Sequence, residues 1–145
     1  MRAVVAKLPE SAVALIESGA HGHLVTINED GSPQVSLVWV AVEDDELCVA
    51  SMSLRQKVKN VRRDPRVAIS FESSEIGDRD LLQYIAIVGT ARITDGGAAA
   101  LLRRLAQVYI GPGSTFPAGD NLPEGYIMRI TPERWHGNGP WAGSH

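Results

Sequence analysis

The residues best suited to chemistry lie in the segment 50–60, where a predicted strand gives way to a predicted helix. Ser51 and Ser53 supply hydroxyl groups, and Lys57 falls one turn into the helix. A helix N-terminus binds phosphate because its first N–H groups lack partners and its dipole is positive there. Lys57 would add a point charge, and Arg55 a forked donor. The segment therefore predicts a phosphate site, with a solvated helix face as the alternative.

The net charge of the chain, −3, conceals an uneven distribution. Residues 55–66 read RQKVKNVRRDPR and carry +5, so the remaining residues carry −8. A local basic block in an acidic protein indicates a specific anionic ligand and argues against general nucleic-acid binding. Helical spacing places Arg55, Lys59 and Arg62 on one face, which could hold a second, extended anionic group.

Other side chains give weaker signals. His21 and His23 share one strand face, either as two metal ligands without a third or as a polar edge. His136, in a glycine-rich tail, is either a proton donor or a surface residue. Cys48 is predicted to be a buried, inert thiol because its strand is apolar. No P-loop, GxGxxG, HExxH or GxSxG motif occurs in the sequence.

The three tryptophans favour two different roles. Trp39 alternates with Val35 and Leu37 along a predicted strand, so we expect it to pack in the core. Trp135 and Trp141 fall in the tail, where exposed indoles would be costly to maintain. We expect these two to cover a groove or to contact another subunit.

Length and composition favour one globular domain over residues 1–145. Hydrophobic residues make up 44% of the chain and charged residues 21%, which is typical of a folded protein. A single cysteine excludes an intramolecular disulfide and a thiolate metal cluster. No apolar run approaches the roughly 20 residues of a membrane span. The N-terminal apolar stretch is too short for a secretory signal, so we expect a cytoplasmic protein.

The hydrophobic pattern predicts a mainly β fold that positions these residues on strands and short helices. Ser53 and Gln56 form a capping-box pattern, with Ser53 as N-cap, and Gly89 predicts a bulge. Leu54, Val58 and Val61 form the apolar face of that helix. Six or seven strands joined by hairpins favour a closed or partly closed antiparallel barrel. The expected helices are 9–18, 53–64 and 97–110, and the expected strands are 22–28, 33–43, 46–52, 66–72, 81–94 and 126–135.

Three of these segments carry a family resemblance when read in order. They are GHLVTINEDGSPQVSLVWV, LCVASMSLRQKVKNVRRDPRVAISF and YIAIVGTARI. Together they resemble the flavin and deazaflavin oxidoreductases of the pyridoxamine 5'-phosphate oxidase-like superfamily, and most of all its actinobacterial branch that uses coenzyme F420. The resemblance covers roughly residues 10–110. It implies a split β-barrel that forms a homodimer, with two cofactor sites at the dimer interface.

The resemblance also implies roles for individual residues. Lys57 would contact the cofactor phosphate, with Arg55 and Gln56 beside it. Lys59 and Arg62 would reach the oligoglutamate tail of F420, which FMN lacks. The remaining positions implied to lie at the deazaflavin ring or its side chain are Ser36, Val38, Ser51 and Met52, with Tyr84 near the site on a later strand.

One departure bears on the choice of cofactor. FMN-using oxidases of the superfamily often have arginine directly before the lysine, whereas this chain has Gln56 there. The resemblance thus favours an F420H2-dependent reductase that passes a hydride to an electron-poor acceptor such as a quinone, an enone or a tetrapyrrole-like molecule. The alternatives are an FMN-dependent oxidoreductase and a protein that binds a deazaflavin or haem-like ligand without turnover. Acceptor specificity is expected in residues 73–80, 111–123 and the tail.

Overall fold

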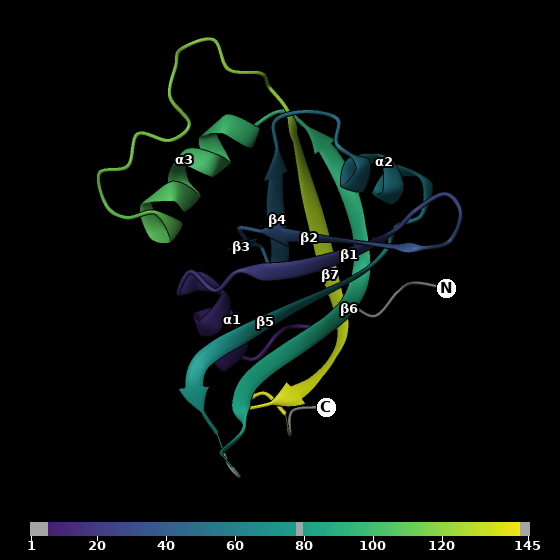
Figure 1. Ribbon diagram of the computed structural model, residues 1–145, viewed down its shortest axis with the longest axis vertical. Helices are drawn as coiled ribbons and strands as arrows, with labels where there is room; N and C mark the ends of the chain where they lie inside the picture. The colour runs from purple at the N-terminus through teal and green to yellow at the C-terminus, as the bar shows by residue number, and fades with distance from the viewer. Residues whose placement is uncertain (1–5, 78–79, 143–145) are drawn as a thin grey trace.

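The computed structural model describes residues 6–77 and 80–142. Three helices and seven strands occur within these residues, as shown in Figure 1. The helices are α1 (Glu10–Glu17), α2 (Gln56–Arg63) and α3 (Ala98–Tyr109). The strands are β1 (Gly22–Ile27), β2 (Pro33–Val38), β3 (Ala41–Glu43), β4 (Glu46–Ser51), β5 (Arg66–Ile76), β6 (Leu82–Asp95) and β7 (Tyr126–Asn138).

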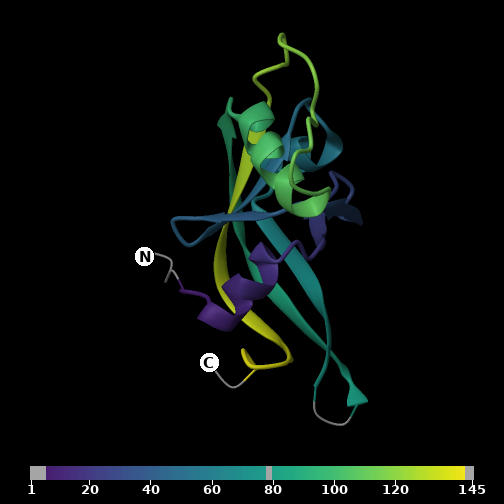
Figure 2. The same cartoon turned by 90° about the vertical axis from the view of Figure 1, so that its left-hand side faces the viewer.

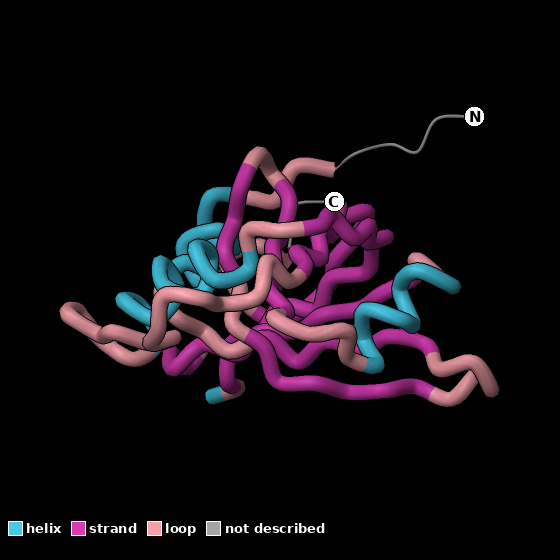
Figure 3. Tube along the Cα trace, turned by 90° about the horizontal axis from the view of Figure 1, so that it is seen from above, coloured by secondary structure: helices cyan, strands magenta, loops and turns pink. Residues whose placement is uncertain are grey.

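The seven strands form one antiparallel sheet in the order β2-β1-β5-β6-β7-β4-β3. The long strands curve strongly, and the β5–β6 hairpin extends beyond the helices (Figures 1 and 2). Viewed from above, helical segments lie on two sides of the strands (Figure 3). This mainly β, split-barrel architecture confirms the fold predicted from the sequence.

The predicted strand 33–43 is divided, and the division transfers the chain between the two edges of the sheet. β2 pairs with β1, whereas β3 pairs with β4. Between them, the amide of Val40 donates to the Tyr109 hydroxyl over 3.0 Å instead of to a strand. The Tyr109 hydroxyl in turn donates to the carbonyl of Ala20 over 2.8 Å. A side chain from α3 therefore fixes the corner of the split barrel.

Gly89 marks the bulge that its position in the sequence predicts. The register between β6 and β7 shifts between Val88 and Gly89. A Cβ atom at Gly89 would collide with the carbonyl oxygen of Thr131. Only glycine permits this close approach of the two backbones. The strands also extend beyond the predicted ends at residues 72 and 135, because β6 is long enough to pair with both neighbours there.

The core fills the space between the curved sheet and the helices. Its largest fully buried side chains include Phe71, Ile69 and Ile85. α1 contributes Ala12 and Ile16. α3 buries Leu101 and Leu105 against the sheet, whereas Val108, near the end of the helix, is 50% exposed. Among the described residues, no helix is long and apolar enough to cross a membrane.

Candidate functional site

The start of α2 differs from the predicted capping box. The helix begins at Gln56, and its N-cap is Arg55, whose side chain forms no capping hydrogen bond. Ser53 lies two residues before the N-cap, and its carbonyl accepts hydrogen bonds from the Ser51 hydroxyl (2.8 Å) and the Arg55 amide (2.9 Å). Gln56 instead donates to the Asn60 side chain over 2.8 Å. Leu54 therefore lies outside the helix, is 44% exposed, and does not extend its apolar face.

The absence of a cap leaves donors available at this helix end. The amides of Val58 and Lys59 donate to the carbonyl of Arg55. Within the part of the chain that the structure describes, the amides of Gln56 and Lys57 have no hydrogen-bond acceptor. Two N–H groups at the positive end of the helix dipole thus remain open to an anion.

Lys57 supplies a positive charge at the same place. Its side chain is half-buried, and desolvation lowers the pKa of its ammonium group below the ordinary value, with a smaller contribution from nearby Arg55. No carboxylate forms an ion pair with Lys57 in residues 6–77 and 80–142. An anion bound here would oppose both causes of that pKa shift. Lys57 is therefore well placed to hold a phosphate.

The rest of the basic stripe is divided by its contacts. Arg62 forms an ion pair with Asp95 (3.4 Å) and lies over the ring of Tyr126, 4.9 Å from its centroid. Arg55 and Lys59 are exposed and form no ion pair among the described residues. Cationic groups available to a ligand are therefore concentrated at the first turns of α2.

A buried polar network holds α2 in place, and it was not among the features predicted from the sequence. Asn60 is fully buried, and its amide donates to the Thr26 hydroxyl (3.0 Å) and to the Asn28 side chain (2.8 Å). The Thr26 hydroxyl donates to Gln34 on β2 over 3.1 Å. Since Gln56 also donates to Asn60, this one side chain connects the start of α2 to the β1–β2 hairpin. The signal was the asparagine three residues after Lys57, on the buried helix face.

The strand residues implied by the resemblance lie on β2 and at the end of β4, in two settings. Ser51 is 5% exposed at the end of β4, and Met52 follows it, half-buried. Ser36 is half-buried on β2, but Val38 is only 6% exposed and belongs to the core. The Val38 side chain therefore has little surface to offer a ligand.

β2 is an edge strand, so part of its backbone is open. The amide of Asn28 donates to the carbonyl of Ser32 over 2.8 Å, and the antiparallel pairing of β1 with β2 continues from there to Gly22 and Val38. Alternate residues of an antiparallel edge direct their N–H and C=O groups outward. On β2 the residues whose backbone groups point outward are Val35 and Leu37, and they are 64% and 63% exposed.

Tyr84 lies away from α2 within one chain. It pairs with Glu72 and Asn138 near the β5–β6 turn, and its ring faces that of His136 at 6.4 Å. Asp95, which contacts Arg62 of α2, is eleven residues further along β6, or roughly 36 Å of extended strand. Figure 1 shows α2 and this turn at opposite ends of the sheet. The structure does not bring Tyr84 to the predicted phosphate site.

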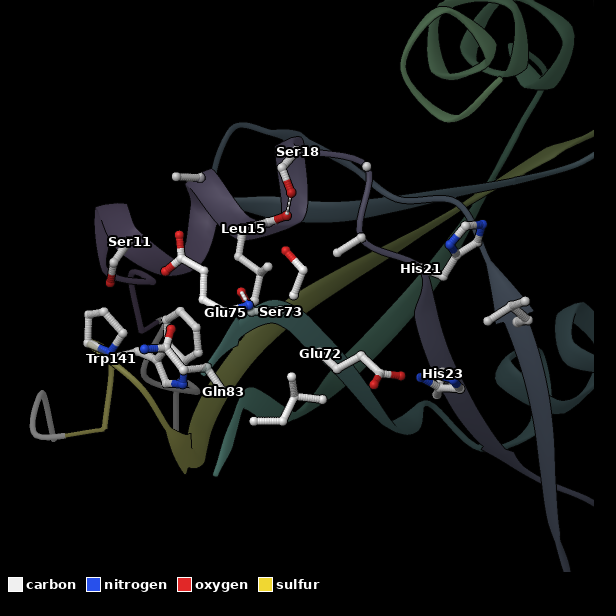
Figure 4. Close-up of a pocket in the computed structure, with 17 residues that line it drawn as sticks. Ser11, Leu15, Ser18, His21, His23, Glu72, Ser73, Glu75, Gln83 and Trp141 are labelled. Atoms are coloured by element: carbon white, nitrogen blue, oxygen red, sulfur yellow. Dashed lines mark hydrogen bonds between the residues drawn. The ribbon is translucent and has the colours of Figure 1, made fainter. Parts of the chain in front are cut away.

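A second region with functional potential is a cavity of about 1060 Å³ between α1, the start of β1 and the end of β5 (Figure 4). His21, His23 and Trp141 line it, together with residues 72–75. Part of the predicted specificity segment 73–80 thus borders a cavity. No cluster of three or more metal-binding side chains occurs among the described residues, which leaves the histidine pair without further ligands.

The segment 111–123 lies elsewhere, beside α3 (Figure 1). Its Phe116 packs edge-on against Trp39 with ring centroids 5.7 Å apart. Trp39 in turn stacks on Tyr109 at 5.2 Å. Trp39 is half-buried and packs against the α3 side of the core, close to the predicted role. Cys48 is fully buried, and desolvation raises the pKa of its thiol to about 11, which fits the inert thiol that was predicted.

Comparison with known families decides the assignment that the fold and the open helix end suggest. A sequence model described as pyridoxamine 5'-phosphate oxidase matches residues 8–139. The chain belongs to this family. The match includes all three helices and all seven strands described above, so it covers the open start of α2 and all of the cavity lining except Pro140 and Trp141.

Solved structures of the pyridoxamine 5'-phosphate oxidase-like fold are similar to this chain over nearly its whole length. One is an F420 reductase, with 29% identity, a TM-score of 0.71, and coverage of 89% of this chain and 98% of that one. Another is a conserved hypothetical protein from Mycobacterium tuberculosis, with 27% identity, a TM-score of 0.71, and coverage of 99% and 90%. HutZ from Vibrio cholerae, named as a heme storage protein, shares the fold at 16% identity and a TM-score of 0.65, with coverage of 97% and 100%.

Proposed function

We propose that this chain is an F420H2-dependent reductase that transfers a hydride to an electron-poor conjugated acceptor. The observation that carries the proposal is the uncapped start of α2, where two open amides meet Lys57, which has no ion-pair partner among the described residues. Family membership and the similarity to an F420 reductase at 29% identity support it. When bound, the reduced deazaflavin supplies the hydride.

The residues at α2 fit an anionic cofactor in both charge and geometry. The amides of Gln56 and Lys57 and the Lys57 ammonium group would hold its phosphate. Arg55 and Lys59, both exposed, would contact a longer anionic tail. FMN would use the same phosphate site without the tail contacts, which makes it the alternative cofactor. A quinone, enone or tetrapyrrole-like molecule would be the acceptor.

In the proposal, the ring of the cofactor is held by residues of β2 and β4. The outward backbone groups of Val35 and Leu37 could pair with the hydrogen-bonding edge of a flat heterocycle. Ser36, Ser51 and Met52 lie on the same two strands or directly after them. Their role in the proposal is to position the ring, and no side chain is assigned to the chemical step.

The proposal includes a homodimer. Exposed Val35 begins a cross-strand row that continues through Val25, Ala68 and Val88, so one sheet face presents an apolar surface. A second copy packed on this face would remove these side chains from water. Because Tyr84 is distant from α2 in its own chain, it would join a cofactor site only when it comes from the other copy.

Paired titrations test the function. F420 and FMN are titrated separately into the wild-type protein, Lys57→Ala and the control Lys7→Ala, which removes an exposed lysine far from α2 in sequence. Loss of a charge-assisted phosphate contact is expected to weaken F420 binding by about tenfold or more in Lys57→Ala and not in the control. Equal affinities in all three proteins would contradict the phosphate assignment. Tighter binding of FMN than of F420 would favour the alternative cofactor.

A further inference from the structure

The cavity beside α1 has the size and composition of a small-molecule site. Its volume of about 1060 Å³ lies near the upper end of the range for such sites. Leu15 and Leu37 provide apolar surface, and Trp141 forms part of a wall (Figure 4). Trp141 is 2% exposed, and its indole N–H donates to the carbonyl of Tyr84 over 2.7 Å. This wall is therefore fixed before any ligand binds.

The polar groups of the cavity have hydrogen-bonding capacity to spare. His21, His23, Glu72, Glu75 and Gln83 all line it, and Figure 4 shows Glu72 extending toward His23. Across the described ranges 6–77 and 80–142, none of these five side chains forms a hydrogen bond or an ion pair with the protein. They are free to bond to a ligand.

The charge of the cavity is opposite to that at α2. Glu72 and Glu75 are carboxylates, and no lysine or arginine of the described chain is among the lining residues. A phosphate-bearing cofactor is attracted to the start of α2 and repelled here. Leu37 lies between Ser36 and Val38 on β2, so one edge of the cavity adjoins the strand on which the resemblance places the cofactor ring, whereas Glu72, paired with Tyr84, lies toward the end of the sheet away from α2.

We propose that this cavity binds the hydride acceptor, and that its two carboxylates select uncharged or cationic acceptors over anionic ones. This inference rests on the proposed function, because it assigns the second reactant of that reaction. Leu15, Leu37 and Trp141 receive the apolar ring system of the acceptor. Glu72 and Glu75 attract a positive substituent or accept hydrogen bonds from hydroxyl or amino groups.

The test uses two naphthoquinones that differ only in one substituent, a trimethylammonium group or a sulfonate group. Equilibrium dialysis measures the affinity of each for the protein without any cofactor present. The protein is expected to bind the cationic quinone about tenfold or more tightly than the sulfonate, because the two carboxylates attract the trimethylammonium group and repel the sulfonate group. The double variant Glu72→Gln/Glu75→Gln is expected to bring the ratio close to one.

A matched pair of helix variants locates the effect. Ala14 and Ala100 are exposed alanines within α1 and α3, but only Ala14 lines the cavity. Arginine is a good helix former, so both helices should tolerate it. Ala14→Arg is expected to weaken binding of the cationic quinone and strengthen that of the sulfonate by several-fold, whereas Ala100→Arg leaves both unchanged.

Equal affinities for the two quinones in the wild-type protein, or equal shifts in Ala14→Arg and Ala100→Arg, would overturn the inference. Titrations with F420 report on the proposed function separately, because they depend on Lys57 and not on this cavity. Failure of F420 and FMN to bind, with a preserved quinone preference, overturns the proposed function and the acceptor role but leaves a ligand site. F420H2 oxidation by both quinones at equal rates, with normal F420 binding, overturns the charge selection alone.

Discussion

Replacing Asn60 by alanine should both destabilise the fold and loosen the proposed phosphate site. Asn60 is fully buried and takes part in three hydrogen bonds of 2.8 to 3.0 Å, with Thr26, Asn28 and Gln56. A hydrogen bond contributes about 1 kcal/mol on average, and some of this is recovered by water near the helix start. The lost packing adds about 1 kcal/mol. The expected loss of unfolding free energy is thus about 3 kcal/mol.

Thermal and urea unfolding followed by circular dichroism measure this loss. For a chain of this length, about 3 kcal/mol corresponds to a fall in Tm of about 10 °C. Asn121→Ala is the control, because it makes the same substitution at an exposed loop position. The Thr26→Val variant and the double variant with Asn60→Ala complete a mutant cycle, with an expected coupling of about 1 kcal/mol. The same proteins are then titrated with F420, whose affinity is expected to fall in Asn60→Ala and not in Asn121→Ala.

A loss below about 1 kcal/mol for Asn60→Ala would refute the network as the attachment of α2. Coupling near zero would mean that Asn60 stabilises the helix without Thr26. Normal F420 affinity in a clearly destabilised Asn60→Ala protein would show that the start of α2 keeps its geometry without the network.

Two further predictions concern Lys57 and Gly89. Because burial lowers the pKa of Lys57, the affinity for inorganic phosphate or F420 should fall as the pH rises through that lowered pKa, earlier than for an ordinary lysine. Titrations from about pH 7 to about pH 10 measure this, and Lys57→Arg should remove the dependence because arginine stays charged; a pH dependence that persists in Lys57→Arg would assign it to another group. Gly89→Ala forces a Cβ against the Thr131 carbonyl and should cost about 2–4 kcal/mol in urea unfolding. Gly31→Ala, which has open space but a φ of 88°, should cost only about 1 kcal/mol, and equal losses would contradict a steric role for Gly89.

The sequence predicted most of the strands because one face of each contributes to the core. β1 alternates buried and half-buried residues along its whole length, and β6 does so from Ile85 to Ala91. Gly89 could be interpreted in advance because a glycine inside a strand has few causes. Local pattern could not show that Val40 leaves the sheet. That break depends on the hydroxyl of Tyr109, which is 69 residues away in the chain.

The candidate site was predicted in part for the same reason. A basic residue one turn into a helix is visible locally, so the sequence singled out Lys57. The capping box is also a local pattern, but it was wrong because the helix begins at Gln56 with Arg55 as its N-cap, and the Gln56 side chain donates to Asn60. Tyr84 was assigned to the site by resemblance alone. Within its own chain it lies at the opposite end of the sheet from α2, and no local sequence pattern connects the two.

The contacts of the basic residues in 55–66 show that only those toward the N-terminal end of α2 have their charge available to a ligand. Arg62 and Arg66 form ion pairs with Asp95 and Asp64, and Arg63 donates to the carbonyl of Ile27. These contacts lie at the C-terminal end of α2, where cations also favour the helix dipole. Among the described residues of the block, those with neither an ion pair nor a side-chain hydrogen bond to the protein are the three toward the N-terminal end, Arg55, Lys57 and Lys59, where the dipole disfavours them. These three cations lower the stability of the helix start, where two amides are also open. An anion bound at this place would offset that cost, which accounts for the cluster.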